Sequence, residues 1–250
     1  MDTKTSWGKV ADWYNNLLEK DEDSYQRMLI LPNLLRLLEV KKGETILDLA
    51  CGQGFFAGEF AKSGAKVIGA DISPELIEIA KQDKNVEYHI SGADKLDFLD
   101  SQSIDKIMLI LSLQNLRNVQ GVFGEAKRVL KPKGKLFMVL NHPAFRIPKQ
   151  SSWGWDEARK TQYRRLDGYL SESLERIQMH PGDNPGEKTV SFHRPLQFYF
   201  KALNKNGFCV SRLEEWVSHK TSETGPKKEA EDKARHEFPL FLFLEAVKIC

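Results

Sequence analysis

Three aspartates and a pair of glycines are the residues whose types and spacing could do chemistry. Asp48 and Asp71 each end a short apolar run, Asp94 follows a third, and Gly52 and Gly54 come soon after the first. Glycines let the backbone take conformations closed to other residues, so that a ligand can lie directly against the main chain. Carboxylates accept hydrogen bonds from hydroxyls, amino groups and cations. The set therefore favours the binding of a nucleotide-like molecule.

The stretch from Glu44 to Gly54 predicts a buried parallel strand that turns abruptly into a helix. The free N–H groups of that helix, from Phe55 on, would point into the space at the turn. Residues 52–57 also fit the G-x-G-x-x-[GA] pattern of dinucleotide sites, which is weak evidence alone. The second strand ends in Asp71, about where an acidic residue must lie to reach the ribose hydroxyls of a nucleotide on the first turn. This context strengthens the interpretation.

Strand and helix patterns alternate around these residues, as in a parallel sheet covered on both faces. In such a sheet, ligands bind beyond the carboxyl ends of the strands, so the aspartates should lie at one edge. Ser73 and Pro74 suit the N-cap and first turn of a helix. The predicted strands are 44–49, 66–71, 86–90, 104–111 and 134–140, and the predicted helices are 10–19, 24–39, 55–63, 74–83 and 119–130.

The regular alternation ends after Asn141. Residues 142–195 are rich in Trp, Tyr, Arg, Pro and Gly, and we expect a helix near 155–175 and a turn at 181–186. A connection this long in a compact domain is usually functional or disordered, and its aromatic content argues against disorder. We therefore predict a lid that covers the site and determines which substrate is bound there. A helix at 195–206 and two strands, 208–217 and 240–248, would follow, with the strands paired antiparallel at the sheet edge.

Composition predicts an ordinary globular protein. Of 250 residues, 41% are hydrophobic and 29% charged, with a net charge of +2. This gives no broad basic field for nucleic acid, so small partners are favoured. No apolar run approaches the roughly 20 residues that span a bilayer, and no signal peptide is evident, so we expect a cytoplasmic protein. Three cysteines, Cys51, Cys209 and Cys250, suggest neither a disulfide framework nor a metal site. We expect one domain with an N-terminal helical cap (1–43), a cofactor-binding core (44–141), the lid (142–195) and a C-terminal part (196–250).

Four motifs together resemble the class I S-adenosylmethionine-dependent methyltransferases, most closely the small-molecule group (methyltransferase type 11) that includes ubiquinone and menaquinone biosynthesis enzymes. They are Ile-Leu-Asp-Leu-Ala-Cys-Gly-Gln-Gly at 46–54, Gly-Ala-Asp-Ile-Ser at 69–73, Gly-Ala-Asp at 92–94 and Arg-Val-Leu-Lys-Pro-Lys-Gly-Lys-Leu at 128–136. The resemblance covers roughly residues 44–140. It implies an α/β, doubly wound, mostly parallel seven-stranded Rossmann-like sheet with an antiparallel last strand. Ala50 departs from it, because many members have glycine there.

The resemblance also implies S-adenosylmethionine as methyl donor and S-adenosylhomocysteine as product. Asp48 would face the cationic amino-acid end, Asp71 would accept from both ribose hydroxyls, and Asp94 would accept from the adenine amino group. Leu111, Ser112 and Gln114 would line the methionine portion. The implied cofactor-binding residues are Tyr14, Asp48, Ala50, Gly52, Gly54, Asp71, Ile72, Ala93, Asp94, Leu111 and Gln114.

The sequence says less about which residues bind the methyl acceptor. Methyl transfer by in-line displacement needs alignment and exclusion of water, while a base is optional. His142 and His193 are the candidate bases, although a loop histidine is more often a hydrogen-bonded bystander. Aromatic residues of the insertion could wall an acceptor pocket or pack on the lid's own core, and basic residues there could meet an anionic substrate or form a solvated helix face. The aromatic set is Trp153, Trp155, Tyr163 and Tyr169, and the basic set is Arg146, Lys149, Arg159, Lys160, Arg164 and Arg165.

Three other functions remain open. An NAD-binding dehydrogenase domain shares the glycines and the ribose carboxylate, but the chain after Leu140 is too short and irregular for a catalytic domain. An RNA or protein methyltransferase is disfavoured by the lack of a basic stripe, and by Ser-Leu-Gln-Asn at 112–115 where many amino-methylating nucleic-acid enzymes of this fold carry Asn/Asp-Pro-Pro-Tyr. A relative that binds the cofactor without turnover is the third, because fold does not establish activity.

Overall fold

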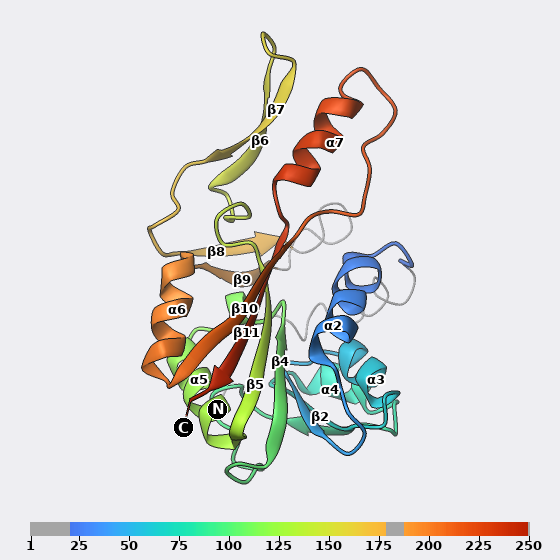
Figure 1. The fold of residues 1–250 in the computed structure, drawn as a ribbon, viewed down its shortest axis with the longest axis vertical. Coiled ribbons are helices and arrows are strands. Elements are labelled where there is room, and N and C mark those ends of the chain that lie inside the picture. Colours follow the sequence, from blue (N-terminus) through green and yellow to red (C-terminus); the bar gives the residue numbers. More distant parts are fainter. Residues whose placement is uncertain (1–20, 179–187, 250) are drawn as a thin grey trace.

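The computed structural model describes residues 21–178 and 188–249 (Figure 1). Its centre is a seven-stranded sheet in the order β10-β11-β5-β4-β1-β2-β3. All neighbouring strands are parallel except β11, which runs antiparallel to both β5 and β10. The predicted sheet with its antiparallel last strand is therefore confirmed. The strands are β1 (Thr45–Leu49), β2 (Lys66–Asp71), β3 (Glu87–Ile90), β4 (Ile104–Ile110), β5 (Leu130–Asn141), β10 (Phe208–Trp216) and β11 (Phe241–Lys248).

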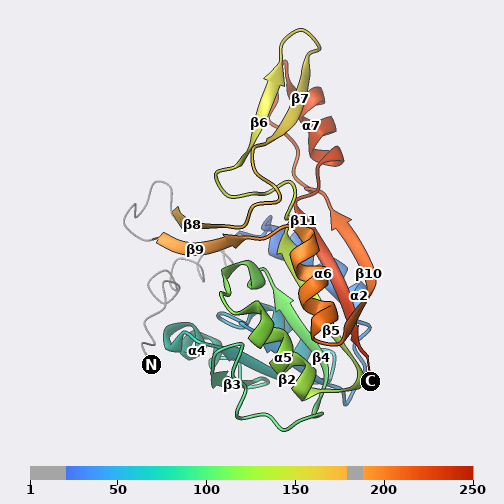
Figure 2. The same cartoon turned by 90° about the vertical axis from the view of Figure 1, so that its left-hand side faces the viewer.

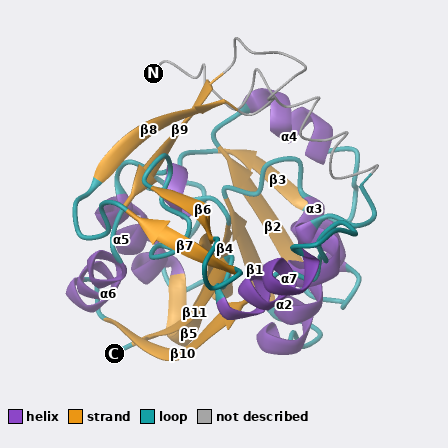
Figure 3. Cartoon of the chain, turned by 90° about the horizontal axis from the view of Figure 1, so that it is seen from above, coloured by secondary structure: helices purple, strands orange, loops and turns teal. Residues whose placement is uncertain are grey.

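Helices cover both faces of this sheet, as Figure 3 shows from above. A π-helical turn, η2 (Gln26–Ile30), leads into α2 (Leu31–Leu38), which packs with α3 (Phe55–Ala61) on one face. On the other face lie α5 (Val119–Val129) and α6 (Leu196–Lys205). A further helix, α4 (Pro74–Ala80), packs against β2 and β3, and Ser73 caps it by accepting from the Leu76 N–H (3.4 Å). The predicted helix at 10–19, the turn at 181–186, Tyr14 and Cys250 lie outside the described residues.

Strand β1 shows why the sheet is buried on both sides. Ile46 belongs to the apolar cluster beneath α2 and α3, whereas Leu47 and Leu49 belong to the cluster beneath α5 and α6. All three side chains are fully buried. A strand buried on both faces reads as a nearly continuous apolar run, which is the pattern that predicted it. Asp48 interrupts that run at the end that carries the site.

The prediction of a helix near 155–175 is wrong. Instead, β6 (Ser151–Asp156) and β7 (Thr161–Leu166) form an antiparallel hairpin, and β8 (Ser173–Gln178) pairs antiparallel with β9 (Lys188–His193). Trp153, Trp155, Thr161 and Tyr163 favour strands and recur at every second position. The helix-favouring residues 157–160 form only the tight turn between them, in which Lys160 has φ +51°.

The two hairpins lie beyond the carboxyl end of β5 (Figures 1 and 2). The β6–β7 hairpin projects away from the sheet beside α7 (Lys228–Glu237), which contacts β7. The β8–β9 hairpin lies closer to the sheet, and β9 contacts the short 3-10 turn η3 (Leu113–Asn115) that follows β4. Among the described residues, no helix is long and apolar enough to cross a bilayer.

Candidate functional site

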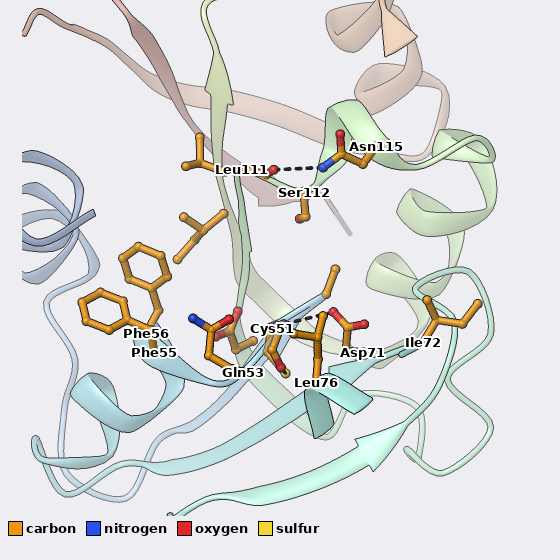
Figure 4. Close-up of a pocket in the computed structure, with 14 residues that line it drawn as sticks. Cys51, Gln53, Phe55, Phe56, Asp71, Ile72, Leu76, Leu111, Ser112 and Asn115 are labelled. Carbon is orange, nitrogen blue, oxygen red and sulfur yellow. Dashed lines mark hydrogen bonds between the residues drawn. The ribbon is translucent and has the colours of Figure 1, made fainter. Parts of the chain in front are cut away.

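A cleft opens where β1, β2 and β4 end at the carboxyl edge of the sheet (Figure 4). Its empty volume, counting the open mouth, is about 760 Å³. Phe55 and Phe56 lie on one side, Asp71 and Ile72 on the other, and Ser112 above. The structure brings seven of the predicted cofactor residues to this cleft, but not Gln114. The seven are Asp48, Ala50, Gly52, Asp71, Ile72, Leu111 and Ser112.

The turn after β1 is held to the end of β2. Asp71 accepts hydrogen bonds through both carboxylate oxygens, from the Gly52 N–H (3.0 Å) and from the Ser73 N–H (2.9 Å). Cys51 donates its N–H to the Ala70 carbonyl (3.1 Å). Burial raises the pKa of Asp71, and these backbone donors oppose the rise. Each oxygen keeps a second lone pair, so Asp71 can brace the turn and still accept from a ligand.

Two non-glycine residues of the cleft have left-handed backbones. Ala50 has φ +59° and Leu111 has φ +53°. This conformation costs roughly 1–2 kcal/mol for a residue with a Cβ, and it persists only where the surroundings impose it. A glycine at position 50, which the resemblance implies for many members, would adopt this conformation without the Cβ penalty. Both strained residues line the cleft. Strained backbone conformations of this kind are concentrated at functional sites.

Gly54 packs against a neighbouring strand, and its predicted contact with the cofactor stays a prediction. A Cβ at this position would lie 2.2 Å from the Tyr88 hydroxyl oxygen, and one at Gly69 would lie 2.5 Å from the Tyr88 ring. The tyrosine of β3 therefore fills the space that both glycines leave. Gly54 is buried and does not line the cleft, whereas Gly52 does.

Three polar atoms around the cleft have no hydrogen-bond partner in the described part of the chain: Asp48 Oδ2, Gln53 Nε2 and Ser112 Oγ. Asp48 is only 2% exposed, and burial raises its pKa to about 7, with the nearby Asp71 charge adding to the rise and the Ala57 N–H opposing it. Leaving buried polar groups unpaired costs about 1–3 kcal/mol each, and more for a charge. A ligand with a cation and hydrogen-bonding groups would remove that cost.

Asp94 and Ala93 stand beside the cleft without lining it. Asp94 Oδ2 accepts from the Asn118 amide (2.8 Å), and Asn118 caps α5 by accepting from the Gly121 N–H (3.0 Å). A Cβ on Gly92 would be 3.2 Å from Asp94 Oδ1 and 4.0 Å from Ile72 Cδ1. Asp94 and Ile72 therefore both border Gly92, and Ile72, which is 47% exposed, also lines the cleft. A flat ligand group could therefore pack on the apolar Ile72 side chain while its polar edge faces the Asp94 carboxylate.

Neither candidate base lines the cleft. His142 is buried, its Nε2 lies 2.7 Å from Glu215 Oε1, and its Nδ1 accepts from the Ala144 N–H (3.2 Å). Burial lowers its pKa. His193 is also buried, with Nε2 2.7 Å from the Tyr169 carbonyl. A catalytic role for either histidine stays a prediction, and it would require the ring to leave these partners.

The predicted aromatic acceptor residues also lie away from the cleft. The Trp153 ring packs edge-on against Phe238 at 5.5 Å, and Trp155 Nε1 donates to Glu157 (2.6 Å). Tyr163 is 47% exposed. Tyr169 accepts from the Leu196 N–H (3.1 Å) through its hydroxyl. These aromatic residues pack within the insertion and against the segment near α7. This was the alternative to an acceptor pocket that the sequence left open. The basic set lies on strands and loops, not on a helix face.

Several cleft residues were missed from sequence: Cys51, Gln53, Phe55, Phe56, Leu76, Ile110 and Asn115. Gln53 stands between the two glycines, so its position could have been inferred from the turn. Phe55 and Phe56 begin α3, whose N-terminus was expected to face the ligand. Asn115 carries no local signal, because η3 brings it to the cleft only after β4 is placed. Within residues 21–178 and 188–249, no group of three or more His, Cys, Asp or Glu side chains could hold a metal ion.

Comparison with known proteins shows a similarity to methyltransferases. Residues 47–138 match the model of a family described as a methyltransferase domain. The demethylmenaquinone methyltransferase of Tropheryma whipplei (strain Twist) is 38% identical over 113 residues, 43% of this chain and 46% of that protein. The ubiquinone biosynthesis O-methyltransferase of Xanthomonas oryzae pv. oryzae (strain PXO99A) is 29% identical over 128 residues, 47% of this chain and 54% of that protein. The chain thus spans about half the length of the curated relatives it matches.

A solved structure extends the likeness. The S-adenosylmethionine-dependent methyltransferase from Mesorhizobium loti aligns with 87% of this chain and 96% of its own, at 26% identity and a TM-score of 0.70. The sequence match spans Asp48, the glycine turn, Asp71 and Asp94, and the structural match spans the sheet that positions them. Both agree with S-adenosylmethionine as the cofactor. Residues 47–138 accordingly match a methyltransferase domain, and most of the chain resembles a solved S-adenosylmethionine-dependent methyltransferase.

Proposed function

We propose that the protein is an S-adenosylmethionine-dependent methyltransferase that moves a methyl group to an O, N or C atom of a small molecule. The observation that carries this proposal is the set of unpartnered polar atoms around the cleft. Asp48 Oδ2 would accept from the ammonium of the methionine portion, and Gln53 Nε2 would donate to its carboxylate. The relatives named for quinone biosynthesis support a small-molecule acceptor, and one of them is named for transfer to oxygen.

The remaining cofactor contacts are those to the ribose and the adenine. Asp71 would accept from the ribose hydroxyls while its backbone hydrogen bonds keep the turn in place. Ile72 would pack on the adenine ring, and Asp94 would accept from the adenine amino group beside it. Ala50 and Gly52 would let the ligand approach the main chain. Asn118, which already donates to Asp94, would orient that carboxylate.

The chain's part in the reaction is alignment and exclusion of water. S-adenosylmethionine supplies a methyl group on a sulfonium, which is already a good leaving group. Leu111 and Ser112 follow β4 and would lie along the methionine portion, where the apolar Phe55 and Phe56 exclude water. Asp48 would ionise as the cationic ligand arrives, because an opposite charge lowers a carboxyl pKa. A base is needed only if the acceptor must lose a proton before transfer.

We further propose that residues 142–195 form the acceptor side, with 1–43 as a helical cap. The β9–η3 contact supports this division, because it places the insertion against the segment that follows β4. A cytoplasmic location, with small molecules and not nucleic acid as partners, is supported by the net charge of +2 and by the free thiols of Cys51 and Cys209.

Calorimetry with S-adenosylmethionine, S-adenosylhomocysteine and NAD tests the cofactor. We expect S-adenosylmethionine and S-adenosylhomocysteine to bind with 1:1 stoichiometry and NAD to bind at least tenfold more weakly. Binding of NAD alone would favour a dehydrogenase-like domain instead. Incubation of the protein with cell extract and methyl-labelled donor then tests transfer. A labelled small molecule is expected, and label found only in RNA or protein would overturn the acceptor class.

Donor binding without any labelled product would identify a protein that binds the cofactor without turnover. The Asp48→Asn variant serves as the matched control for both experiments, because it keeps the shape of the side chain and removes its charge. It should weaken donor binding and lower transfer together.

A further inference from the structure

A second cavity lies beside the cleft, on the other side of η3. Its empty volume, counting the open mouth, is about 360 Å³. Asn115 lines the cleft and its neighbour Gln114 lines this cavity. Both side-chain amides donate to the Leu111 carbonyl, at 3.4 Å from Asn115 and 2.7 Å from Gln114. The two spaces are therefore adjoining and share one short segment of chain.

The cavity contains two buried polar atoms with no hydrogen-bond partner in the described residues. They are Gln114 Oε1 and Arg194 Nη1, on side chains whose residues are 8% and 5% exposed. The bond to the Leu111 carbonyl identifies which end of the Gln114 amide is the nitrogen, so the free atom is an acceptor. The cavity thus presents one free acceptor and one free cationic donor.

Arg194 is held so that only part of its guanidinium is used. Nη2 donates to the carbonyls of Leu116 (2.9 Å) and Arg117 (3.1 Å). The rings of Phe192 and Phe198 lie 4.6 Å and 5.2 Å from the guanidinium carbon. The Nε of Arg194 reaches Glu172 only at 4.0 Å, the limit of an ion pair. A rigid, stacked guanidinium with a free N–H is the geometry that recognises planar anionic groups.

Arg146 provides a second cation at the same cavity. It donates to Asn141 Oδ1 (2.8 Å) and lies over the Phe241 ring at 5.3 Å. The surrounding protein lowers its pKa, and the charge of Arg164 lowers it further. No Asp or Glu is among the described residues that line the cavity. Arg194 is buried, whereas Arg146 is exposed to solvent beside it. A buried cation with an unpaired N–H is costly, and an anionic ligand that contacts both arginines would offset that cost.

We propose that this cavity is the acceptor site and that the acceptor carries a carboxylate or phosphate group. Arg146 and Arg194 bind the anion, and a hydroxyl or amino group of the acceptor donates to Gln114 Oε1, next to the donor cleft. The inference rests on the proposed methyltransferase function and adds the substrate class to it. Arg146 follows β5 and Arg194 follows β9, so both ends of the insertion contribute a cation.

The first test uses two simple probes, inorganic phosphate and benzoate, with the protein saturated with S-adenosylhomocysteine. Chemical-shift titration should show binding of at least one probe, and the stronger of the two identifies the anion. Arg146→Gln should weaken that binding about tenfold or more, as expected for the loss of a hydrogen bond to a charged group. Arg146 is preferred to Arg194, because Arg194 also supports two backbone carbonyls and its removal could prevent folding.

Arg176→Gln is the matched control. Arg176 is exposed on β8, and its neighbour Ile177 lines the cavity. Because successive side chains of a strand point to opposite faces, Arg176 points away from the cavity. It should bind the probes as the unchanged protein does. Equal weakening by both substitutions, or binding of neither probe, would overturn the proposal.

The second test uses the labelled product from cell extract. At neutral pH it should be retained by an anion-exchange resin, and Arg146→Gln should raise KM for the acceptor with a smaller change in kcat. A neutral or cationic product would overturn this inference while leaving the methyltransferase function intact. Failure to bind S-adenosylmethionine or S-adenosylhomocysteine at all would instead overturn the proposed function, so the two failures are distinguishable.

Discussion

Replacing Asp48 by Asn should make folding less dependent on pH. In the folded chain burial raises the pKa of this carboxyl from 3.8 to about 7. The folded state therefore binds a proton more tightly than the unfolded state, and the free energy of unfolding falls as pH rises between about 4 and 7. The shift is about three units at about 1.4 kcal/mol each, so ionised Asp48 costs on the order of 4 kcal/mol above pH 7. Asn carries no such charge.

The size of the effect depends on what Asn leaves unpaired. Its carbonyl can accept from the Ala57 N–H, as Asp48 does. Its amide would take the position of the free Oδ2 and leave a buried donor unpaired, at a cost of about 1–3 kcal/mol. Asp48→Asn should therefore be more stable than the unchanged protein at pH 8 by about 1–3 kcal/mol, and equal or less stable at pH 5.

Urea unfolding at pH 5 to 8.5 measures this difference. His142 contributes to the pH dependence with the opposite sign, because burial lowers its pKa and its neutral form is favoured in the folded state. The comparison between the two proteins removes that contribution, since both contain His142. Equal slopes of unfolding free energy against pH would refute the reasoning that Asp48 is buried with an unpaired oxygen.

Donor binding should show the complementary behaviour. A proton on Asp48 competes with the cationic ligand, so the affinity of the unchanged protein for S-adenosylmethionine should rise up to about pH 7 and then level off. Asp48→Asn should remove this dependence and lower the affinity at pH 8 by about 1.5–3 kcal/mol. Calorimetry in buffers of different ionisation enthalpy would also detect the proton released on binding. A variant that binds the donor as tightly as the unchanged protein would contradict the assignment.

The other predictions concern the turn, the ribose contact and the hairpin. Ala50→Gly should raise the free energy of unfolding by about 1 kcal/mol, because φ +59° strains a residue with a Cβ, and a loss of stability in urea would contradict this. Gly54→Ala should lower it by about 1–3 kcal/mol, since its Cβ meets the Tyr88 hydroxyl, and adding Tyr88→Phe should recover part of the loss. Asp71→Ala should weaken donor binding by about 1.5–3 kcal/mol in calorimetry, and unchanged affinity would remove its assigned role. Deleting residues 151–166, whose flanking residues share a hydrogen bond of 2.9 Å, should keep donor binding within tenfold, about 1.4 kcal/mol, and a larger loss would mean that the hairpin supports the cleft.

Local sequence was sufficient for the elements that carry the cofactor site. Strand β1, the turn at Gly52, and the capped start of α4 each depend on signals within a few residues, namely an apolar run, a glycine and a Ser-Pro pair. The alternation of strands and helices then placed Asp48 and Asp71 at the same edge, because parallel strands end together. Over residues 155–175 local signals conflicted, and the alternation of aromatic residues prevailed over the helix-favouring turn residues.

The sequence by itself determined which segments form the strands of the parallel sheet and where the glycine turn lies, since these depend on hydrophobic periodicity and backbone freedom. Only the tertiary structure decided which polar atoms lack partners and which of the two glycines lines the cleft. Tyr88 packs on Gly54 because β3 pairs with β2, and no local pattern contains that pairing. Arg146 and Arg194 line one cavity because the chain between them returns to the sheet through β9. Contacts between distant residues follow from packing, whereas secondary structure follows largely from neighbours along the chain.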